Sequence, residues 1–418
     1  MTHLRDVDPA IYEAINNEMT RGRNGLEMIA SENYVSRAVL QTTGSIFTNK
    51  YSEGYPAKRY YGGNEYVDVV ENLAIERAKK LFGANYVNVQ VHSGTQSNMA
   101  VYFAFLQPQD PILSMSLDHG GHLSHGHKVN FSGKLYNIHS YPVDEQTHLI
   151  NMDIVRAKAK EVKPKIILAG FSAYPRDLDF KAFREIADEV DALLLSDIAH
   201  IAGLVAAKEV SVDPVEHSHI ITTTTHKTLR GPRGAIVMSQ SEEHAKLIDR
   251  AVFPGMQGGP LDHAVAAKAV AFHEALKPEF KEYAKLVKAN AKALAESLVA
   301  QGAQLVTGGT DNHLVLMDIT PYVDGGKIAE HTLDSVGIFT NKNMIPYDKR
   351  SPFDPSGVRL GTPALTTRGL QPEDLKVVGE LIVKTLQNHD KPDVLDRVRA
   401  DVAQICDRYP LYPDLQIC

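Results

Sequence analysis

The 418-residue sequence contains no tryptophan and only two cysteines, Cys406 and Cys418. Two cysteines near one end of a chain give no disulfide framework and no thiolate metal site, which fits reducing surroundings. No apolar run approaches the ~20 residues that span a bilayer. The first residues, MTHLRDVDPAIYE, are polar and acidic where a signal peptide would be apolar. We therefore expect a cytoplasmic protein without a membrane segment.

Positive charge is also scarce in this sequence. The chain has 44 lysines and arginines against 51 aspartates and glutamates, a net charge of -7, so no overall positive field attracts nucleic acid or anionic lipid. Hydrophobic residues make up 43% and charged residues 23%, which is the balance of an ordinary globular protein and not of a disordered or fibrous one. The length predicts two or three domains, and we expect small-molecule partners.

Short apolar segments alternate with helical patterns between residues 86 and 238. The segments NVQV, PILSMSL, KIILAG, ALLLSD, HIITTTT and AIVMS are expected to be strands that are buried on both faces. Helical patterns cover residues 96–106 and 180–190 between them. This alternation predicts an α/β fold with a largely parallel central sheet that is covered by helices.

Helical patterns dominate the two ends of the chain. A helix is expected over residues 9–19 with Asp8 as its N-cap, and a long, interrupted helical stretch covers residues 261–301. Beyond this stretch, QLVTG and HLVLMDI are predicted strands. Further helices are expected to begin at Gly326, Pro372 and Val394. We therefore divide the chain into a helical arm (1–20), a large domain (21–275) and a smaller C-terminal α+β domain (276–418).

Lys227 is the first candidate for chemistry. It follows residues 220–225, IITTTT, whose β-branched side chains indicate a buried strand. A lysine at the end of such a strand can be partly desolvated, which lowers its pKa and frees the amine to attack a carbonyl group. The alternative is a lysine whose stem lies on the sheet while its charge reaches solvent.

Asp197 follows another apolar strand, at the sheet edge where α/β folds bind ligands. A carboxylate there could keep a pyridine nitrogen protonated, with an ion-pair energy of roughly 5 kcal/mol before desolvation. The protonated ring would then be a strong electron sink. The alternative is an aspartate that only caps the next helix.

Two glycine-containing segments are candidate phosphate sites. Ser93-Gly94-Thr95 precedes a helical pattern, and the first N–H groups of a helix attract anions. Residues 253–260, FPGMQGGP, are expected to form a loop with an exposed backbone, whose N–H groups could also bind a phosphate. An ordinary N-cap without a ligand remains the alternative for the first segment.

A cluster of four histidines and one isolated arginine complete the candidates. His119, His122, His125 and His127 lie in HGGHLSHGH, but the paired glycines and the lack of neighbouring Asp, Glu or Cys ligands argue against a zinc site. We expect no metal there, and instead an imidazole stacked on an aromatic cofactor or plain loop histidines. Arg359 lies in an apolar strand and needs an anion, either a substrate carboxylate or an internal salt-bridge partner.

Nearly the whole chain, from MIASENYVS near residue 28 to the C-terminal helices, resembles the serine hydroxymethyltransferases, also called glycine hydroxymethyltransferases. The motifs that carry the resemblance are TNKYSEGYPAKRYYGGNEYVD, HSGTQSN, HGGHLSHG, GFSAYPRDLDF, SDIAHIAGL, TTTTHKTLRGPRG, FPGMQGGP and RLGTPALTTRG. Several ordered motifs of this length do not arise by coincidence. The resemblance implies a fold-type I pyridoxal-phosphate enzyme with a large cofactor-binding domain and a smaller C-terminal domain.

The resemblance also implies roles for individual residues. Pyridoxal phosphate would form an internal aldimine with Lys227, Asp197 would pair with its ring nitrogen, and His122 would stack on the ring. The other implied cofactor-binding positions are Ser93, Gly94, Thr95, Ser172, His200, Arg233, Gly258 and Gly259, the last two from a second subunit. The implied catalytic positions are Lys227, Glu53, His226, Tyr51, Tyr61 and Thr224. Those implied for the amino-acid substrate are Ser31, Tyr61 and Arg359, and those for folate are Glu53, Leu117, Gly121 and Asn343.

The implied reaction is the reversible transfer of the hydroxymethyl carbon of serine to tetrahydrofolate, which gives glycine and methylenetetrahydrofolate through an aldimine and a quinonoid. It implies a homo-oligomer, at least a dimer with shared active sites. Asp118 and Tyr347 depart from the family pattern in stretches associated with folate. An α-methylserine hydroxymethyltransferase and a folate-independent β-hydroxy amino acid aldolase remain alternatives within the family. A metal-dependent hydrolase built on the four histidines and a non-catalytic folate- or RNA-binding protein are alternatives of other classes.

Overall fold

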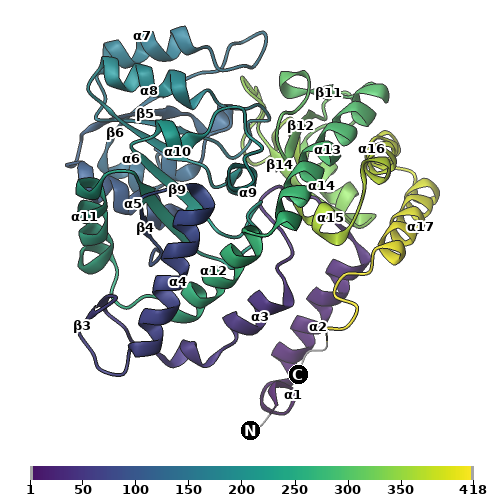
Figure 1. Ribbon diagram of the computed structural model, residues 1–418. Coiled ribbons are helices and arrows are strands. Elements are labelled where there is room, and N and C mark those ends of the chain that lie inside the picture. The colour runs from purple at the N-terminus through teal and green to yellow at the C-terminus, as the bar shows by residue number, and fades with distance from the viewer. Residues whose placement is uncertain (1–2, 416–418) are drawn as a thin grey trace.

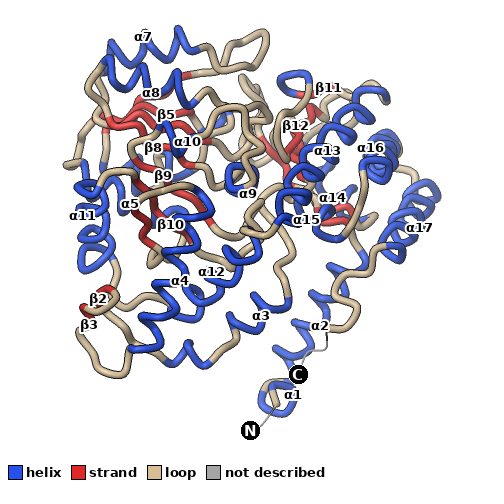
Figure 2. Tube along the Cα trace, in the orientation of Figure 1, coloured by secondary structure: helices blue, strands red, loops and turns tan. Residues whose placement is uncertain are grey.

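The computed structural model describes residues 3–415, so Met1, Thr2 and the last three residues, including Cys418, lie outside the description. A large sheet with its helices and a smaller sheet with its helices lie side by side, as Figures 1 and 2 show. The helices are α1 (Leu4–Val7), α2 (Pro9–Asn24), α3 (Arg37–Thr43), α4 (Glu65–Phe82), α5 (Gly94–Phe105), α6 (Phe131–Leu135), α7 (Met152–Val162), α8 (Phe180–Glu189), α9 (Ala202–Ala206), α10 (Pro214–His217), α11 (Glu242–Arg250), α12 (Asp262–Ala275), α13 (Pro278–Ala300), α14 (Gly326–Ser335), α15 (Pro363–Arg368), α16 (Pro372–Gln387) and α17 (Pro392–Arg408).

The strands and the shorter helical turns complete the element order. The strands are β1 (Leu26–Glu27), β2 (Gly54–Tyr55), β3 (Lys58–Arg59), β4 (Tyr86–Asn88), β5 (Pro111–Met115), β6 (Asn137–Tyr141), β7 (Ile166–Gly170), β8 (Leu193–Asp197), β9 (Ile220–Thr224), β10 (Ala235–Ser239), β11 (Gln304–Leu305), β12 (Leu314–Asp318), β13 (Ile338–Phe339), β14 (Asn341–Asn343) and β15 (Gly357–Gly361). The turns are η1 (Ile46–Asn49), η2 (Leu117–His119), η3 (Leu123–His125), η4 (Ala251–Met256) and η5 (Val306–Gly308).

The central sheet has the strand order β4-β10-β9-β8-β7-β5-β6. Neighbouring strands from β9 to β6 are parallel, whereas β10 runs antiparallel to both β9 and β4. The mostly parallel α/β sheet predicted from the sequence is therefore confirmed. Asp197 is in register with Gly170 on β7 and with Thr222 on β9. The carboxyl ends of these strands consequently lie along one edge of the sheet, and the residues that follow them emerge there.

The central sheet separates two hydrophobic cores. Because side chains alternate along a strand, Ile167 and Leu194 pack into one core with α8 and the first half of α13. Ile166 and Leu195 pack into the other core with α5 and α11. Every residue of β7, β9 and β10 is buried, as expected for strands that are covered on both faces.

The second sheet, with the order β11-β12-β15-β14, is antiparallel throughout and belongs to a third core that includes residues of α14, α16 and α17. The long helix α13 joins this core to the first. Its residues Phe280 and Val287 pack beneath the central sheet, and Leu294 and Leu298 pack beneath the second one. Leu26 also packs in this third core. The domain boundaries at residues 20 and 275 remain predictions.

Several boundaries differ from those expected. The segment NVQV is a strand only at its first residue, because β4 ends at Asn88. QLVTG is a strand only over Gln304–Leu305, and the chain then turns through Thr307, whose φ is 64°. The edge strand β6 is missed because its sequence, NIHSY, is mostly polar and has no fully apolar face. The start of the expected loop 253–260 belongs to the helical turn η4.

The N-terminal helix α2 begins at Pro9 as predicted, and the carboxylate of Asp8 accepts a hydrogen bond of 3.1 Å from the N–H of Ile11. It extends beyond Met19 to Asn24. From residue 3 to residue 415, none of the helices combines the length and the apolar character that crossing a bilayer requires.

Candidate active site

A cavity of about 400 Å³ lies at the carboxyl edge of the central sheet. Its wall is built mainly from segments that follow neighbouring strands, with a contribution from β15 of the second sheet. The residues that line it are Ser31, Ser93, Gly94, Thr95, Leu117, His122, Leu123, Phe171, Ser172, Asp197, Ala199, His200, Thr224, His226, Lys227, Arg233 and Arg359. Most of the positions implied by the sequence resemblance therefore lie around one cavity.

Lys227 lies in this wall, three residues beyond the end of β9, and only 8% of it is exposed. Burial lowers the pKa of its amine to about 8, although the charge of Asp197 opposes this shift. Among residues 3–415, the Lys227 Nζ has no hydrogen-bond partner, and it lines the cavity. An amine with this pKa is partly unprotonated near neutral pH, which makes it a competent nucleophile.

Asp197 is the last residue of β8, and hydrogen bonds from three residues hold its carboxylate. His125 Nε2 and Asn98 Nδ2 each lie 2.9 Å from Asp197 Oδ2, and the N–H of Ala199 donates to Oδ1 at 3.1 Å. Burial by itself raises the pKa of Asp197, but the hydrogen bond and the charge of His125, with the hydrogen bond from Asn98, outweigh it and hold the pKa below its ordinary value. The carboxylate is therefore charged inside the protein.

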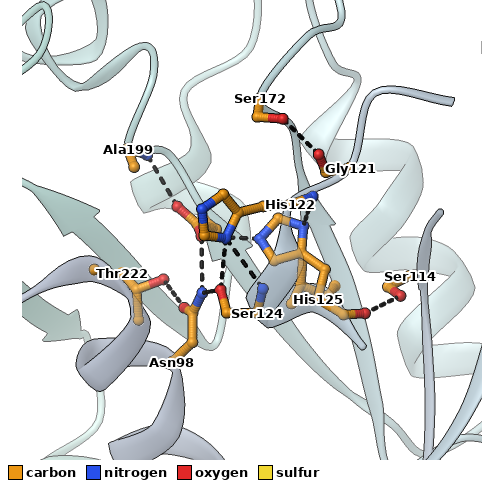
Figure 3. A network of polar contacts seen from close by, with 12 residues as sticks. Asn98, Ser114, Gly121, His122, Ser124, His125, Ser172, Ala199 and Thr222 are labelled. Atoms are coloured by element: carbon orange, nitrogen blue, oxygen red, sulfur yellow. Dashed lines mark hydrogen bonds and ion pairs between the residues drawn. The ribbon is translucent and has the colours of Figure 1, made fainter. Parts of the chain in front are cut away.

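His125 and Asn98 hold the carboxylate of Asp197, and neither was predicted from the sequence to do so. Asn98, on α5, also accepts a hydrogen bond from Thr222 Oγ1 and donates to Ser124 Oγ, so its orientation is fixed (Figure 3). His125 was considered only as part of a histidine cluster. Their one signal in the sequence is their place inside the motifs HSGTQSN and HGGHLSHG.

His122 presents a neutral ring to the same cavity. Its Nδ1 lies 2.8 Å from Ser124 Oγ and accepts a hydrogen bond of 3.2 Å from the N–H of Ser124. Burial, followed by the charge of His125, lowers the pKa of His122 to about 4. A neutral, flat ring held at its edge can stack against an aromatic ligand.

The cavity wall also contains groups that suit an anion. Ser93 caps α5, and Gly94 and Thr95 are its first two residues, whose N–H groups have no acceptor inside the helix. A Cβ atom on Gly94 would lie 2.7 Å from Thr224 Cγ2, so glycine is needed at this close approach. His226 Nδ1 is buried without a partner among the described residues. Arg233 adds a positive charge to this part of the wall.

Arg359 reaches the cavity from β15, and 8% of it is exposed. Its Nε donates to Asn341 Oδ1 at 3.0 Å, and its Nη1 donates to the carbonyl oxygen of Ser172 at 2.7 Å. Between residues 3 and 415 it has no carboxylate partner, so the internal salt bridge considered as an alternative is absent. Burial lowers the pKa of Arg359 to about 10, which leaves the guanidinium charged at neutral pH.

His200 and the unpredicted His313 form a buried pair beside Arg359. Their rings stack with centroids 5.3 Å apart, and His200 Nδ1 lies 3.1 Å from His313 Nε2. Burial lowers the pKa of both imidazoles, to about 3 in His313. The pair therefore supplies neutral hydrogen-bonding groups, and the fixed positive charges of the cavity wall belong to Arg233 and Arg359.

A family model described as serine hydroxymethyltransferase matches residues 4–382. The chain belongs to the serine hydroxymethyltransferase family. Members of this family are transferases that generally depend on pyridoxal phosphate. The match covers both sheets, and the family fold agrees with the mostly parallel sheet described above.

The cavity of this serine hydroxymethyltransferase family member fits pyridoxal phosphate by the chemistry of its donor groups. The start of α5, His226 and Arg233 offer donors and positive charge in the cavity wall, which suits a phosphate. The charged Asp197 suits a protonated ring nitrogen, and Lys227 offers an amine to an aldehyde. The residues present would therefore hold the cofactor.

Seven of the residues implied by the family resemblance do not line this cavity, and five of these seven lie together elsewhere. Tyr51, Glu53, Tyr61, Gly258 and Gly259 form a separate group, which we call the Tyr51 cluster. Tyr51 Oη donates to Glu53 Oε1 at 3.3 Å, and the rings of Tyr51 and Tyr61 meet edge to face with centroids 5.3 Å apart. A Cβ atom on Gly258 would lie 3.1 Å from Glu53 Oε1. The chain thus brings these residues together, but not around its own Lys227.

Of the four residues implied for folate, Glu53 belongs to the Tyr51 cluster, and Leu117 alone lines the Lys227 cavity. Leu117 lines both the Lys227 cavity and a neighbouring cavity of about 670 Å³, which Asp118 and Met344 also line. Gly121 packs tightly, since a Cβ atom there would lie 2.2 Å from the carbonyl oxygen of Met115. The side chain of Asn343 donates to the carbonyl oxygen of Met344 at 2.7 Å and lines neither cavity.

The four histidines of HGGHLSHGH point to different partners. His119 Nδ1 accepts a hydrogen bond of 3.2 Å from Val143 N–H, and His127 Nδ1 accepts one of 3.5 Å from Val129 N–H. His125 binds Asp197, so an acidic partner that is distant in the sequence is close in space. In the described part of the chain, no three His, Cys, Asp or Glu side chains converge as a metal site requires.

Proposed function

We propose that this chain catalyses the reversible transfer of the hydroxymethyl group of serine to tetrahydrofolate, giving glycine and methylenetetrahydrofolate. The observation that carries the proposal is the presence of Lys227, Asp197 and Arg359 around one cavity. Lys227 would hold pyridoxal phosphate covalently, and the bound cofactor supplies an electron sink for the bond that breaks at the α-carbon. Asp197 would keep the ring nitrogen protonated, and His122 would cover one face of the ring.

Arg359 is the proposed site for the carboxylate of the amino acid, with Ser31 beside it. Its guanidinium is buried, charged and without a carboxylate partner in the described chain, so an incoming carboxylate would satisfy it. Fixing the carboxylate sets which bond at the α-carbon stands perpendicular to the cofactor ring. This orientation selects the bond that breaks.

We propose that a second copy of the chain completes the site. The Tyr51 cluster contains the residues implied for the hydroxymethyl group, and it lies outside the Lys227 cavity of its own chain. Tyr51 is 59% exposed and Tyr61 51%, so both are available to a neighbouring subunit. Glu53 would then transfer a proton at the hydroxymethyl oxygen or at the folate nitrogen. At least a dimer follows from this proposal, and we place it in the cytoplasm because disulfides have no role in its site.

The assignment is tested by substrate preference. Turnover of serine, α-methylserine and allo-threonine should be compared with and without tetrahydrofolate. We expect serine to be the best substrate, with glycine formation that depends on tetrahydrofolate. A best substrate that is cleaved equally fast without tetrahydrofolate would replace the transferase by an aldolase. A preference for α-methylserine over serine would instead identify the chain as an α-methylserine hydroxymethyltransferase.

The visible absorption spectrum of the pure protein provides the second test. Glycine should change the spectrum of the bound cofactor, and tetrahydrofolate should enhance that change. A protein that is colourless, takes up no pyridoxal phosphate and still turns over serine would contradict the cofactor assignment. A serine-independent activity abolished by chelators would instead support the hydrolase alternative.

A further inference from the structure

A second buried lysine, Lys268, lies on α12 and is only 2% exposed. Its Nζ donates to three main-chain carbonyl oxygens, those of Val89 at 2.7 Å, Val91 at 3.1 Å and Ala235 at 2.8 Å. Among residues 3–415 it forms no salt bridge. A neutral amine has only two N–H groups, so three such bonds require the charged ammonium.

The three carbonyl groups belong to two segments that lead into the candidate active site. Val89 and Val91 connect the end of β4 to Ser93, which caps α5. Ala235 begins β10, directly after the turn that follows Lys227. Lys268 therefore ties the segment that carries the proposed phosphate-binding N–H groups to the segment that carries the proposed cofactor lysine.

The Val89–His92 segment depends on side chains for its hydrogen bonds because the sheet ends before it. The carbonyl oxygen of Gln90 accepts a bond of 2.9 Å from Gln257 Nε2, and the N–H of His92 donates to Gln257 Oε1 at 3.2 Å. Lys268 binds the carbonyl groups on either side of Gln90. Buried backbone groups need partners, so Lys268 and Gln257 together replace the missing neighbouring strand.

Close packing fixes the position of the lysine itself. A Cβ atom on Gly234 would lie 2.5 Å from Lys268 Cε and 3.2 Å from its Nζ. The side chain is thus pressed against the backbone of the turn that ends at Ala235. Burial lowers the pKa of Lys268 to about 7, while the charge of Glu71 opposes the shift. The three carbonyl groups favour the ammonium form as well.

We propose that Lys268 is a positioning residue that sets the distance between the start of α5 and the Lys227 turn. It touches neither the cavity nor its ligand, and it acts through the two backbone segments that it joins. The proposal rests on the proposed function in that the anion at the start of α5 is taken to be the phosphate of pyridoxal phosphate. The effect on the backbone itself does not depend on that assignment.

The test is the Lys268→Met variant, which keeps an unbranched side chain as far as the Cε position and removes the ammonium donors. Apoprotein prepared from the wild type and from the variant should be titrated with pyridoxal phosphate, and the dissociation constants compared. We expect an increase of about tenfold to a hundredfold in the variant, the range of losing one or two good hydrogen bonds to the ligand. Hydrogen exchange of the two apoproteins should show faster exchange at the amides of residues 89–97 in the variant.

Arg368 provides a matched control. It is a second buried cation bound to main-chain carbonyl groups, and it lies at the end of α15, outside the cavity wall. Its acceptors are the carbonyl oxygens of Gly22, Arg23, Gly25, Cys406 and Tyr409. We expect Arg368→Met to lower the melting temperature at least as much as Lys268→Met, with unchanged affinity for pyridoxal phosphate and unchanged exchange at residues 89–97.

The outcomes separate the two proposals. Equal dissociation constants and equal exchange in the wild type and Lys268→Met would overturn the positioning role, as would an equal loss of affinity in Arg368→Met. If the wild type binds no pyridoxal phosphate, the proposed function fails, and the exchange comparison still decides the role of Lys268. If Lys268→Met does not fold, Gly234→Ala replaces it as the test, because the added Cβ atom would displace the side chain of Lys268 and leave its amine present. We expect a smaller rise in the dissociation constant for pyridoxal phosphate and a smaller increase in exchange at residues 89–97.

Discussion

The Lys227 cavity and the Tyr51 cluster differ in how much of their chemistry one chain completes. In the cavity, Arg359 is buried and Asp197 and His122 are half-buried, and their hydrogen bonds come from the same chain. In the Tyr51 cluster, Tyr51 and Tyr61 are more than half exposed. The comparison teaches that one chain holds most residues of the proposed cofactor site around one cavity, and displays part of the proposed substrate site elsewhere on its surface.

The exposed side chains of the Tyr51 cluster nevertheless stand on a well-anchored backbone. Ser52, between Tyr51 and Glu53, is fully buried, and its Oγ lies 2.7 and 2.9 Å from the two carboxylate oxygens of Asp262. Arg59 Nη1 donates to the carbonyl oxygens of Ser52 and Gly54 at 3.0 Å each. The cluster is thus held in place before any partner arrives, which reduces the ordering cost of assembly.

Among the predicted changes, removal of Lys227 from the cavity should lower activity the most. We expect Lys227→Ala to lower kcat by about three orders of magnitude or more, because the nucleophile acts as a unit with the groups around it. Borohydride reduction of the wild-type holoprotein followed by peptide mapping should label Lys227. Label on the peptide that contains Lys268 would show that the wrong buried lysine has been chosen, and the exposed Lys285→Ala serves as the control.

Loss of the negative charge of Asp197 should cause the second-largest loss of activity. Asp197→Asn keeps the size of the side chain but removes the charge that pairs with a protonated ring nitrogen. We expect kcat to fall about 10²- to 10³-fold, the range for losing one preorganised electrostatic contact. Steady-state kinetics on serine and the cofactor spectrum measure this. Asp213→Asn changes a carboxylate outside the cavity wall and should leave both unchanged.

A mixed dimer tests whether the two regions act together. Lys227→Ala removes the cavity function of one chain, and Glu53→Gln removes the cluster function of the other. After subunit exchange, half of the dimers should be mixed and each should contain one intact site, so activity should recover to about a quarter of the wild-type value. Activity that stays at the level of the two parent variants would mean that each site is built within one chain.

The smallest predicted effect is on the stability of the apoprotein, measured as its free energy of unfolding at different pH values. The pKa of Lys227 is about 8 in the folded chain and near 10.5 ordinarily, so between these pH values the unfolded chain keeps a proton that the folded chain has lost. The free energy of unfolding should therefore rise with pH across this window, by about 3 kcal/mol at most. Denaturant titrations of the wild type and Lys227→Met should diverge there. Parallel curves would show that Lys227 keeps an ordinary pKa.

Most of the central sheet could be predicted because its strands are short, apolar and separated by clear helical patterns. The error at NVQV has a specific physical cause. Its alternating residues suit a strand, but the sheet ends at Asn88, and side chains from α12 and from the 253–260 segment satisfy the backbone beyond it. No local sequence pattern indicates that Lys268, which is 179 positions away, donates a hydrogen bond to the carbonyl oxygen of Val89.

The candidate site was predictable where a charge stands out against apolar neighbours. Lys227 and Asp197 each follow an apolar strand, and Arg359 interrupts one. A charged residue in such a place is unusual, so the sequence indicated all three as candidate site residues. His125, Asn98 and His313 were missed because polar residues in helices and turns are ordinary, and only the fold brings them to Asp197 and His200. The separation of the Tyr51 cluster from the cavity also required the structure.

The helix α13 has a consequence for how the pocket can open. Lys227 is attached to the central sheet and Arg359 to the second sheet, and the bond from Arg359 to the carbonyl of Ser172 crosses between them. The helix α13 packs into the core of the central sheet and into the core of the second sheet, so it connects the two sheets. The distance between the Lys227 amine and the Arg359 guanidinium therefore depends on the angle between the two sheets, and this angle would set the length of the amino acid that the proposed site accepts.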